Sequence, residues 1–378
     1  MPQKLDILII GGGISGLLVA RELQMAGREV TIIDKSATGQ EASWAGGGIL
    51  LPIYPWRQAP AISELVLKSL QIYPKLSHEL HAATDIDPEW HPCGMLITKN
   101  PDYDNAIAWC RNRHVMFSDA PNAMLKELNT ECDRPLWLPD IAQARNPRLL
   151  KSLKAYLQSR GVNFIESTRI DAVEISKQRI KTIRTAEQDI EPNHVVVCAG
   201  AWTGHLLRTW LPQASIQLPI QPIRGQMLLF DAKPETLSHM VLDGDHYLIP
   251  RQDGKILAGS TVEQAGFKKT ATQEAKENLY RFATELLPDL KNYPICEHWA
   301  GLRPGSPDGV PYIGFHPDIE NLSINAGHFR NGLVMGPASA QLLANLILKR
   351  PTQVNPEPYA IKQRLETQSN APNQYELG

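Results

Sequence analysis

Short apolar runs alternate with helical patterns at the start of the chain. The first apolar run is Leu5 to Ile10, a helical pattern follows from Leu17 to Met25, and a second apolar run extends from Glu29 to Ile33. Apolar runs of this length are typical of strands that are buried on both faces of a parallel sheet. The opening of the chain therefore predicts a strand, a helix and a second strand of an α/β sheet.

The same patterns predict elements further along the chain. Helices are expected over residues 61–83, 102–113, 145–160, 273–287 and 333–349. Strands are expected over residues 94–98, 162–166, 169–176, 179–185, 194–198, 222–230, 246–251, 255–259 and 322–325. Residues 218–301 are strand-rich, with Asp253-Gly254 as a hairpin turn, and predict a second, α+β domain built on an antiparallel sheet.

A glycine-rich loop, Gly11 to Gly16, joins the first strand to the first helix, and Asp34 closes the second strand 18 residues later. Gly11 permits the tight turn, Gly13 lets a pyrophosphate approach the backbone, and Gly16 lets the helix pack closely on the strand. The helix start offers free N–H groups to phosphates, and the carboxylate of Asp34 can accept hydrogen bonds from a ribose. This context predicts a Rossmann-type dinucleotide site, but the motif alone does not distinguish NAD from FAD.

The nucleotide-binding domain is expected to be discontinuous. The apolar strand 194–198 is followed by the small residues Ala199 to Ala201 and by Trp202, which fit the carboxyl end of a strand, where ligands bind in open α/β sheets. We expect residues 1–90, 145–215 and 300–350 in the nucleotide-binding domain and residues 91–144 and 216–299 in the second domain. Residues 351–378 are polar and contain proline, and a loosely ordered tail is expected there.

Composition excludes several classes of protein. The 378 residues are 43% hydrophobic and 21% charged with a net charge of -2, which gives no electrostatic reason to propose a nucleic-acid or anionic-membrane partner. No apolar run approaches the length of a membrane span, and the first strand begins too early to leave room for a signal peptide, so a cytoplasmic location is expected. The five cysteines are scattered and form no CxxC pair, which argues against a disulfide framework and a metal site.

Several further blocks support a family resemblance. They are Ser43-Trp44-Ala45-Gly46-Gly47-Gly48, Trp299-Ala300-Gly301-Leu302-Arg303-Pro304-Gly305, Pro311-Tyr312-Ile313-Gly314 and Gly327-His328-Phe329-Arg330-Asn331-Gly332. Together with the glycine loop and Asp34, in this order, they closely resemble the D-amino-acid oxidase-like flavoenzymes. Within that family they look most like the blocks of bacterial glycine oxidases associated with thiamine biosynthesis.

The resemblance implies noncovalent FAD. Some relatives attach the flavin to a cysteine between the block that contains Arg303 and the final glycine-rich block, and residues 305–327 contain no cysteine. The adenine end is expected near Ile170, and the isoalloxazine between residues 47–49 and 328–334. The implied FAD-binding residues are Gly11, Gly13, Ile14, Ser15, Gly16, Asp34, Lys35, Ala42, Ser43, Gly47, Gly48, Ile49, Ile170, His328, Phe329, Arg330, Asn331, Gly332, Leu333 and Val334.

The reaction implied by the resemblance is oxidation of the C–N bond of a small amino acid. A hydride moves from the α-carbon to the flavin, oxygen reoxidises the flavin to give H2O2, and the imine hydrolyses to an oxo acid and ammonia. Glycine, sarcosine and small D-amino acids are the expected substrates, and glycine would give glyoxylate. A homotetramer is also implied by the family.

Three residues are expected to act on the substrate. Arg303 should clamp the substrate carboxylate, because a guanidinium presents a planar fork of donors. Tyr247 should donate its hydroxyl to the same carboxylate. Arg330 should offer its backbone carbonyl to the amine while its side chain steers or gates.

Other side chains near these residues have less defined expectations. Strand alternation places His246 on the face opposite Tyr247. Met227 and Val262 either line a small pocket or pack in the core. His328 either donates to the flavin or packs.

Three alternatives stay open at the level of sequence. A D-amino-acid dehydrogenase would pass electrons to a membrane quinone instead of oxygen, although no amphipathic anchor is evident. A sarcosine oxidase would need only slightly more room for an N-methyl group. A non-catalytic FAD-binding subunit would not need both Tyr247 and Arg303.

Overall fold

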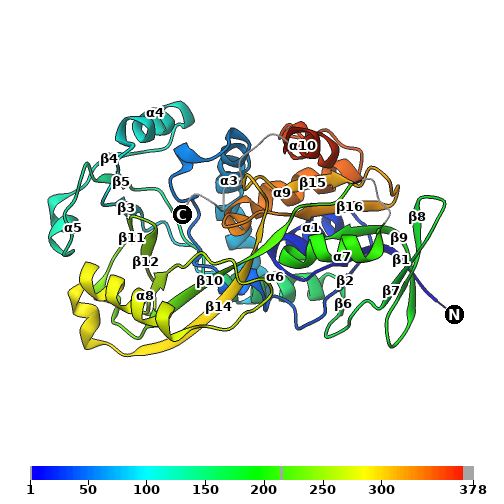
Figure 1. Ribbon diagram of the computed structural model, residues 1–378, viewed down its shortest axis with the longest axis horizontal. Helices are drawn as coiled ribbons and strands as arrows, with labels where there is room; N and C mark the ends of the chain where they lie inside the picture. Colours follow the sequence, from blue (N-terminus) through cyan, green and yellow to red (C-terminus); the bar gives the residue numbers. More distant parts are fainter. Residues whose placement is uncertain (1, 213–215, 369–378) are drawn as a thin grey trace.

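The computed structural model describes residues 2–212 and 216–368, which form two eight-stranded sheets side by side (Figure 1). The first sheet has the order β15-β16-β9-β1-β2-β6, and the β7–β8 hairpin extends it from β9. Its strands are β1 (Gln3–Ile10), β2 (Val30–Ile33), β6 (Asn163–Ile165), β7 (Ala172–Ser176), β8 (Arg179–Arg184), β9 (Asp189–Val197), β15 (Tyr312–Phe315) and β16 (Leu322–Ala326).

The first strand has the parallel neighbours that its apolar run predicts. In β1, Ile7 pairs with Val30 of β2 and with His194 of β9. Successive side chains of β1 alternate between two cores: Ile7 and Ile9 lie in one, and Leu8 in the other. The run is apolar without interruption because both faces of the strand are covered by protein.

Helices cover both faces of this sheet. The core on the face of Ile7 contains buried residues of α1, α3, α6 and α9, and the core on the other face contains residues of α7 and α10. The α-helices are α1 (Ile14–Met25), α2 (Ala42–Ala45), α3 (Pro60–Thr84), α4 (Tyr103–Arg113), α5 (Asn122–Lys126), α6 (Asn146–Ser159), α7 (Thr203–Trp210), α8 (Gln273–Leu286), α9 (Gly332–Ile347) and α10 (Ile361–Gln368). Short 3-10 turns are η1 (Pro55–Arg57), η2 (Gly200–Trp202), η3 (Pro234–Thr236), η4 (Pro288–Asn292) and η5 (Glu357–Tyr359).

The second sheet has the order β14-β10-β13-β12-β11-β3-β5-β4, with all pairs antiparallel except β11 with β3. Its strands are β3 (Met95–Ile97), β4 (Ser118–Asp119), β5 (Leu136–Leu138), β10 (Gln221–Phe230), β11 (Met240–Asp243), β12 (His246–Pro250), β13 (Ile256–Gly259) and β14 (Ile295–Gly305). Helix α8 packs on one face through a core that includes Leu248 and Leu279. Tyr247 and Ile249 lie on the opposite face of β12, toward the first sheet's core.

The fold class expected from the sequence, an α/β domain joined to an antiparallel-sheet domain, is confirmed. The strands of each sheet come from the segments assigned to the corresponding domain, and β14 crosses between the two sets. The domain boundaries themselves stay a prediction, and residues 213–215 lie outside the described residues.

The stretch expected to be a loose tail differs from that expectation. Residues 351–368 contain η5 and α10, with Tyr359 and Ile361 almost fully buried. The Tyr359 hydroxyl donates to the Ala61 carbonyl at 2.7 Å, and Arg364 pairs with Asp308 at 2.7 Å. A few apolar anchors in a polar stretch are enough to dock it, so the expectation is wrong for this part. Residues 369–378 lie outside the described residues.

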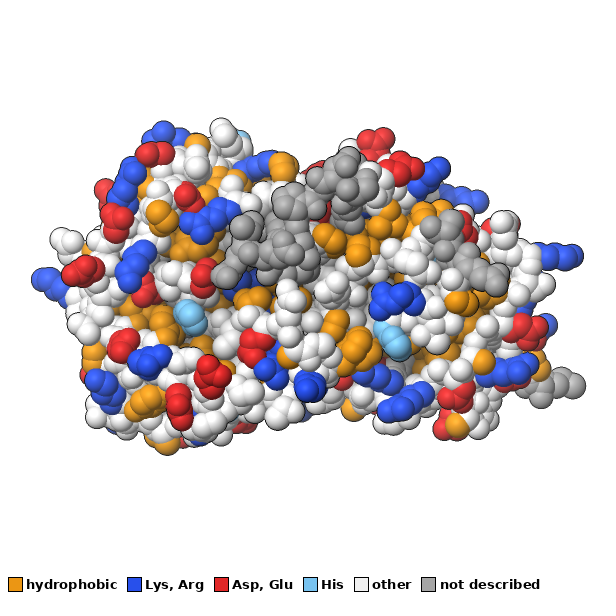
Figure 2. Space-filling view, in the orientation of Figure 1, with side chains coloured by type: hydrophobic (Ala, Val, Ile, Leu, Met, Phe, Trp, Pro, Cys, Tyr) orange, Lys and Arg blue, Asp and Glu red, His pale blue; other side chains and the backbone are white. Residues whose placement is uncertain are grey.

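The surface carries charges of both signs. On the face shown in Figure 2, Lys and Arg side chains are interspersed with Asp and Glu side chains. Within residues 2–212 and 216–368, no helix has the length and apolar character needed to cross a bilayer.

Candidate active site

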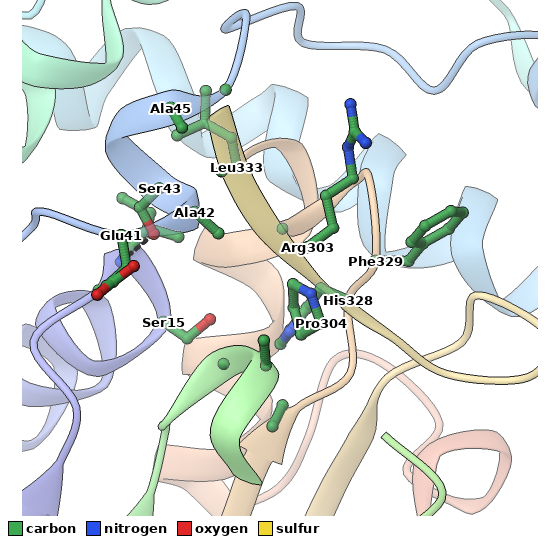
Figure 3. A pocket seen from close by; sticks show the side chains of 18 of the residues that line it. Ser15, Glu41, Ala42, Ser43, Ala45, Arg303, Pro304, His328, Phe329 and Leu333 are labelled. Atoms are coloured by element: carbon green, nitrogen blue, oxygen red, sulfur yellow. Dashed lines mark hydrogen bonds between the residues drawn. The ribbon is translucent and has the colours of Figure 1, made fainter. Parts of the chain in front are cut away.

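A cavity of about 740 Å³ collects most of the residues singled out in the sequence. It is bounded by the glycine loop, residues 41–49, the segment after β9, the facing strands of the second sheet and the turn before α9. In Figure 3, Ser15 and Ser43 lie on one side of it, and Arg303, His328 and Phe329 on the other. The cavity therefore joins the predicted nucleotide site to the predicted substrate residues.

The dinucleotide end is shaped by backbone amides. The Gly12 amide donates to one Asp34 oxygen at 2.7 Å, and the Ser36 amide donates to the other at 2.9 Å. Burial raises the pKa of Asp34, and these two hydrogen bonds act in the opposite direction. Asp34 lines the cavity and also fixes the glycine loop, a second role that the sequence did not predict.

The adenine end predicted near Ile170 also lies on the cavity wall. Ile170 lines it together with Thr168 and Arg169. Lys35 lies nearby, with its ammonium 3.2 Å from the centroid of the Trp202 ring. Such a cation–π contact holds the Lys35 side chain flat against the end of the cavity.

Residues 42–49 form a second wall of the cavity, and hydrogen bonds to neighbouring segments hold this wall in place. The Ile14 amide donates to the Ser43 hydroxyl at 2.9 Å, the Ala144 amide donates to the Gly48 carbonyl at 2.9 Å, and Asn146 donates to the Ser43 carbonyl at 2.6 Å. Gly48 has φ +86 and a Cβ there would overlap the Ala144 carbonyl. Ala42, Ser43, Gly47, Gly48 and Ile49 all line the cavity.

The turn before α9 forms the opposite wall. His328, Phe329, Arg330, Asn331, Gly332 and Leu333 line the cavity, and α9 begins at Gly332 with its free N–H groups toward this turn. Burial lowers the pKa of His328 to about 4, so its ring is neutral. The ring Nε2 lies 3.2 Å from the Ser339 hydroxyl, whose single proton is donated to the Gly336 carbonyl. His328 therefore carries its hydrogen on Nε2 and donates to Ser339.

Arg303 lies at the far end of the cavity with Tyr247 and Met227. Its guanidinium donates to the Thr261 carbonyl at 2.9 Å and to the Ser260 hydroxyl at 2.8 Å. It lies against Gly225, where any Cβ would overlap it. Burial lowers the pKa of Arg303 to about 10, the charge of Arg330 acts in the same direction, and the group stays protonated at neutral pH.

The two guanidinium groups at this end lack an anionic partner. Among the described residues, no carboxylate forms an ion pair with Arg303 or Arg330, and Arg330 Nη2 is buried without a hydrogen-bond partner. Glu263, which is close enough to influence Arg303, is paired with Arg224 instead. Both side chains are partly buried, and a partly buried cation without a counter-charge is costly, so this end of the cavity fits an anionic ligand group.

The rest of the cavity fits a polar cofactor. Asn146 and Asn325 line it at 2% and 1% exposure, and the Asn146 carbonyl oxygen and both amide atoms of Asn325 have no hydrogen-bond partner within the described part of the chain. Buried polar atoms without partners cost free energy, and a cofactor with many hydroxyl and phosphate groups would satisfy them. The residues present therefore fit a bound dinucleotide.

Some expectations from the sequence need correction. Gly16 and Val334 do not line the cavity: Gly16 packs directly under the Gly11 carbonyl, and Val334 is buried in the helix core. Val262 is 49% exposed on the loop after β13 and does not line the cavity, because strand β13 and its alternation end at Gly259. Met227 does line it, and His246 stacks on Phe282 of α8, on the opposite face from Tyr247 as expected.

The sequence did not single out several residues of the cavity wall. Asn325 lies near the end of strand β16, where the rule of ligands at the carboxyl ends of strands would have found it. Asn146 precedes a proline at the start of α6, and nothing in its local sequence marks it. Tyr54 and Arg57 reach the cavity from the loop before α3.

Residues 6–346 match the family described as "FAD dependent oxidoreductase", DAO. With this match, the chain belongs to the DAO family of FAD-dependent oxidoreductases, and FAD is its cofactor. The chain is 42% identical to a glycine oxidase of Pseudomonas aeruginosa over 95% of its own length and 99% of that protein. It is 30% identical to the bifunctional protein ThiO/ThiG of Trichormus variabilis, over 91% of its length and 53% of that protein.

The fold is also found in a crystal structure of glycine oxidase from Geobacillus kaustophilus. The TM-score is 0.88 at 24% sequence identity, covering 95% of this chain and 98% of that one. At this identity the match shows the shared fold.

Proposed function

We propose that the chain oxidises glycine and other small amino acids with FAD. The observation that supports this most directly is the uncompensated guanidinium of Arg303, fixed beside Tyr247 at the end of a dinucleotide-sized cavity. Relatives that span nearly the whole chain are named glycine oxidases. A small amino acid supplies the carboxylate that this guanidinium lacks.

The carboxylate is held by Arg303 and Tyr247. Three N–H groups of Arg303 donate to the carbonyls of Thr261 and Arg224 and to the Ser260 hydroxyl, and the remaining two donors of the guanidinium bind the substrate oxygens. The Tyr247 hydroxyl, which donates to the Met227 sulfur at 3.5 Å in the protein alone, turns to one of the same oxygens. A thioether is a weak acceptor, so little is lost when the hydroxyl turns to the substrate.

Arg330 contributes on the other side. Its backbone carbonyl accepts a hydrogen bond from the substrate amine, and its side chain adds positive charge near that of Arg303. Met227 and Tyr247, both almost fully buried, limit the room around the α-carbon and favour substrates with small side chains.

The chemistry balances with water and oxygen as the other reactants. FAD, when bound, would supply the acceptor for the two electrons and one proton that leave the α-carbon, and O2 takes these together with a second proton that the iminium product releases on hydrolysis. The protein residues orient the α-carbon and keep the carboxylate fixed. Glycine, O2 and water then give glyoxylate, ammonia and H2O2. No lining residue is assigned as the base, so the amine reacts in its neutral form.

The test is an H2O2 assay on purified holoenzyme under air with glycine, sarcosine and small D-amino acids. We expect peroxide with glycine and a yellow protein that releases flavin on acid precipitation. A colourless protein, or turnover only with a quinone or dye acceptor, would overturn the proposal in favour of a non-catalytic subunit or a dehydrogenase. Preference for sarcosine over glycine would mark a sarcosine oxidase.

The cellular setting is also part of the proposal. We place the protein in the cytoplasm as a homotetramer, with glycine imine supplied to thiamine thiazole synthesis as one use of the reaction. The named similarity to ThiO/ThiG supports the last point. Light scattering of the purified protein tests the tetramer, and growth of a deletion strain without thiamine tests the role.

A further inference from the structure

A further arginine, Arg251, lies behind the cavity wall and has no role in the proposed oxidation of the substrate. It directly follows β12 and is 9% exposed. Among the described residues, no carboxylate forms an ion pair with it. Burial lowers the pKa of Arg251 to about 10, so it remains a buried cation at neutral pH.

The guanidinium of Arg251 spans two segments of the chain. One terminal nitrogen donates to the side chain of Gln143 at 2.6 Å, and the other donates to the Gly47 carbonyl at 2.8 Å. Gln143 is itself held, since its amide donates to the Pro250 carbonyl at 2.6 Å. Arg251 is thus a rigid bridge from the end of β12 to the Gly47 backbone.

Strand alternation makes this bridge relevant to the substrate residue. Tyr247 and Ile249 alternate in β12 and therefore share one face, and Arg251, the first residue after the strand, reaches the same backbone segment through the Gly47 carbonyl. All three touch the same place: a Cβ on Gly47 would lie 2.8 Å from Ile249 and 3.2 Å from the Tyr247 ring. Gly47 therefore lies between strand β12, which carries Tyr247, and the cavity.

We propose that Arg251 is a positioning residue that latches the strand of Tyr247 to the Gly47-Gly48 wall of the cofactor cavity. Through the Gly47 carbonyl it fixes the distance between the wall against which FAD binds and the hydroxyl that receives the substrate. Because no carboxylate among the described residues pairs with it, it also places a positive charge behind that wall. The effect of Arg251 on the position of the Tyr247 hydroxyl rests on the proposed function, whereas its effect on the wall of the FAD cavity does not.

The first test measures FAD release from full-length holoenzyme, followed as free-flavin fluorescence after dilution. Arg251→Met removes both hydrogen bonds and the charge, and we expect release at least about tenfold faster and a lower midpoint potential of the bound flavin. Arg251→Lys keeps the charge but cannot bridge both partners, so we expect faster release with a potential close to that of the wild type. The matched control is Arg21→Met, since Arg21 is 6% exposed and does not line the cavity.

The second test measures acetate, which has the carboxylate of the substrate without its amine, by its perturbation of flavin absorbance. In Arg251→Lys we expect acetate to bind about threefold more weakly, because Tyr247 loses its fixed distance to the wall. If Arg251→Met does not fold, Gln143→Leu removes one partner of the guanidinium, keeps its charge, and replaces Arg251→Met in the measurement of FAD release. The proposal would be overturned if two variants, Arg251→Lys and either Arg251→Met or Gln143→Leu, released FAD at the wild-type rate and had the wild-type flavin potential within error. Neither measurement requires glycine turnover, so a failed glycine assay leaves this test intact.

Discussion

The two ends of the cavity are built by different means. At the dinucleotide end, one continuous segment from Gly11 to Asp34 supplies a strand, a helix start and a carboxylate, and its contacts are largely backbone amides. At the substrate end, Tyr247 and Arg303 come from strands of the second sheet that lie far apart in the sequence. The first end is local in sequence and made of backbone donors; the second is assembled at a distance and carries excess positive charge.

This difference indicates that the two ends can be damaged separately. A pyrophosphate and its sugars are met by many weak, interchangeable backbone donors, so one side-chain change removes only part of the affinity. A small amino acid has few atoms, and a single guanidinium supplies much of its binding. Changes at the substrate end should therefore alter KM with FAD retained, and changes at the dinucleotide end should alter FAD affinity first.

The largest effect is expected for Arg303→Ala. Removing a charge-assisted, two-point hydrogen bond of about 3 kcal/mol should raise KM for glycine by about 100-fold or more. FAD absorbance and release should stay as in the wild type. Steady-state kinetics of the holoenzyme check the first expectation and flavin fluorescence the second.

The matched control is Arg281→Ala, because Arg281 is exposed on α8 and its hydrogen bond among the described residues is to Asn278. An unchanged KM in Arg303→Ala would remove this residue from the substrate site. Loss of FAD in the same variant would show that the two ends are not separable.

The next largest effect is expected for Asp34→Asn at the other end. An amide has one acceptor oxygen, so either the Gly12 or the Ser36 amide loses its partner, at a cost of about 1–2 kcal/mol. FAD should dissociate about tenfold more readily, while KM for glycine, measured at saturating FAD, should be unchanged. A shift in KM at saturating FAD would contradict the separation.

Much of the dinucleotide end could be predicted from sequence because its information is local. The strand, the glycine turn and Asp34 follow one another within a single short segment, and each has a physical reason to be there. The bonds from Gly12 and Ser36 to Asp34 were not predicted, since they depend on the exact path of the turn.

The substrate end was less accessible. Tyr247 and Arg303 were found through a resemblance between motif blocks; their spacing alone gives no reason to bring them together. Packing between distant segments also decides where the side chains of Asn146 and Arg251 lie. It likewise pairs Arg224 with Glu263, and this pairing leaves Arg303 without a counter-charge among the described residues. The ordered segment around Tyr359 was not predicted for the same reason. The polar composition of this stretch does not show that a few of its apolar side chains pack against the rest of the protein.

A smaller effect is expected for Tyr247→Phe. The change removes one hydroxyl from the substrate carboxylate and keeps the ring against Gly47. One hydrogen bond to the charged carboxylate, less the weak bond to the Met227 sulfur that the hydroxyl gives up, contributes about 1 kcal/mol, which predicts a roughly fivefold higher KM for glycine and little change in FAD release. Steady-state kinetics with glycine and with acetate as inhibitor would show whether both ligands lose the same contact. Equal KM values for the variant and the wild type would assign the hydroxyl to packing.

The smallest effect at neutral pH, and one that belongs to neither end alone, is expected for His328→Gln in the turn between them. Burial depresses the pKa of His328 from 6.5 to about 4, so the folded protein holds this ring neutral while the unfolded chain protonates it. The stabilising contribution is therefore complete above pH 6.5 and is lost as the pH falls toward 4, by about 3 kcal/mol in total. Burial depresses the pKa values of His194 and His239 in a similar way. The variant should therefore remove only the contribution of His328 to the loss of stability at low pH.

The glutamine of this variant keeps an amide that can donate to Ser339, but it does not titrate in this range. The Tm of His328→Gln should therefore fall less steeply than that of the wild type as the pH is lowered from 6.5 to 4. At about pH 8 the two Tm values should lie close together, because the wild-type ring is then neutral in both the folded and the unfolded chain. Thermal unfolding across this pH series is the measurement, and parallel curves would mean that the pKa of His328 is the same in the folded and the unfolded chain.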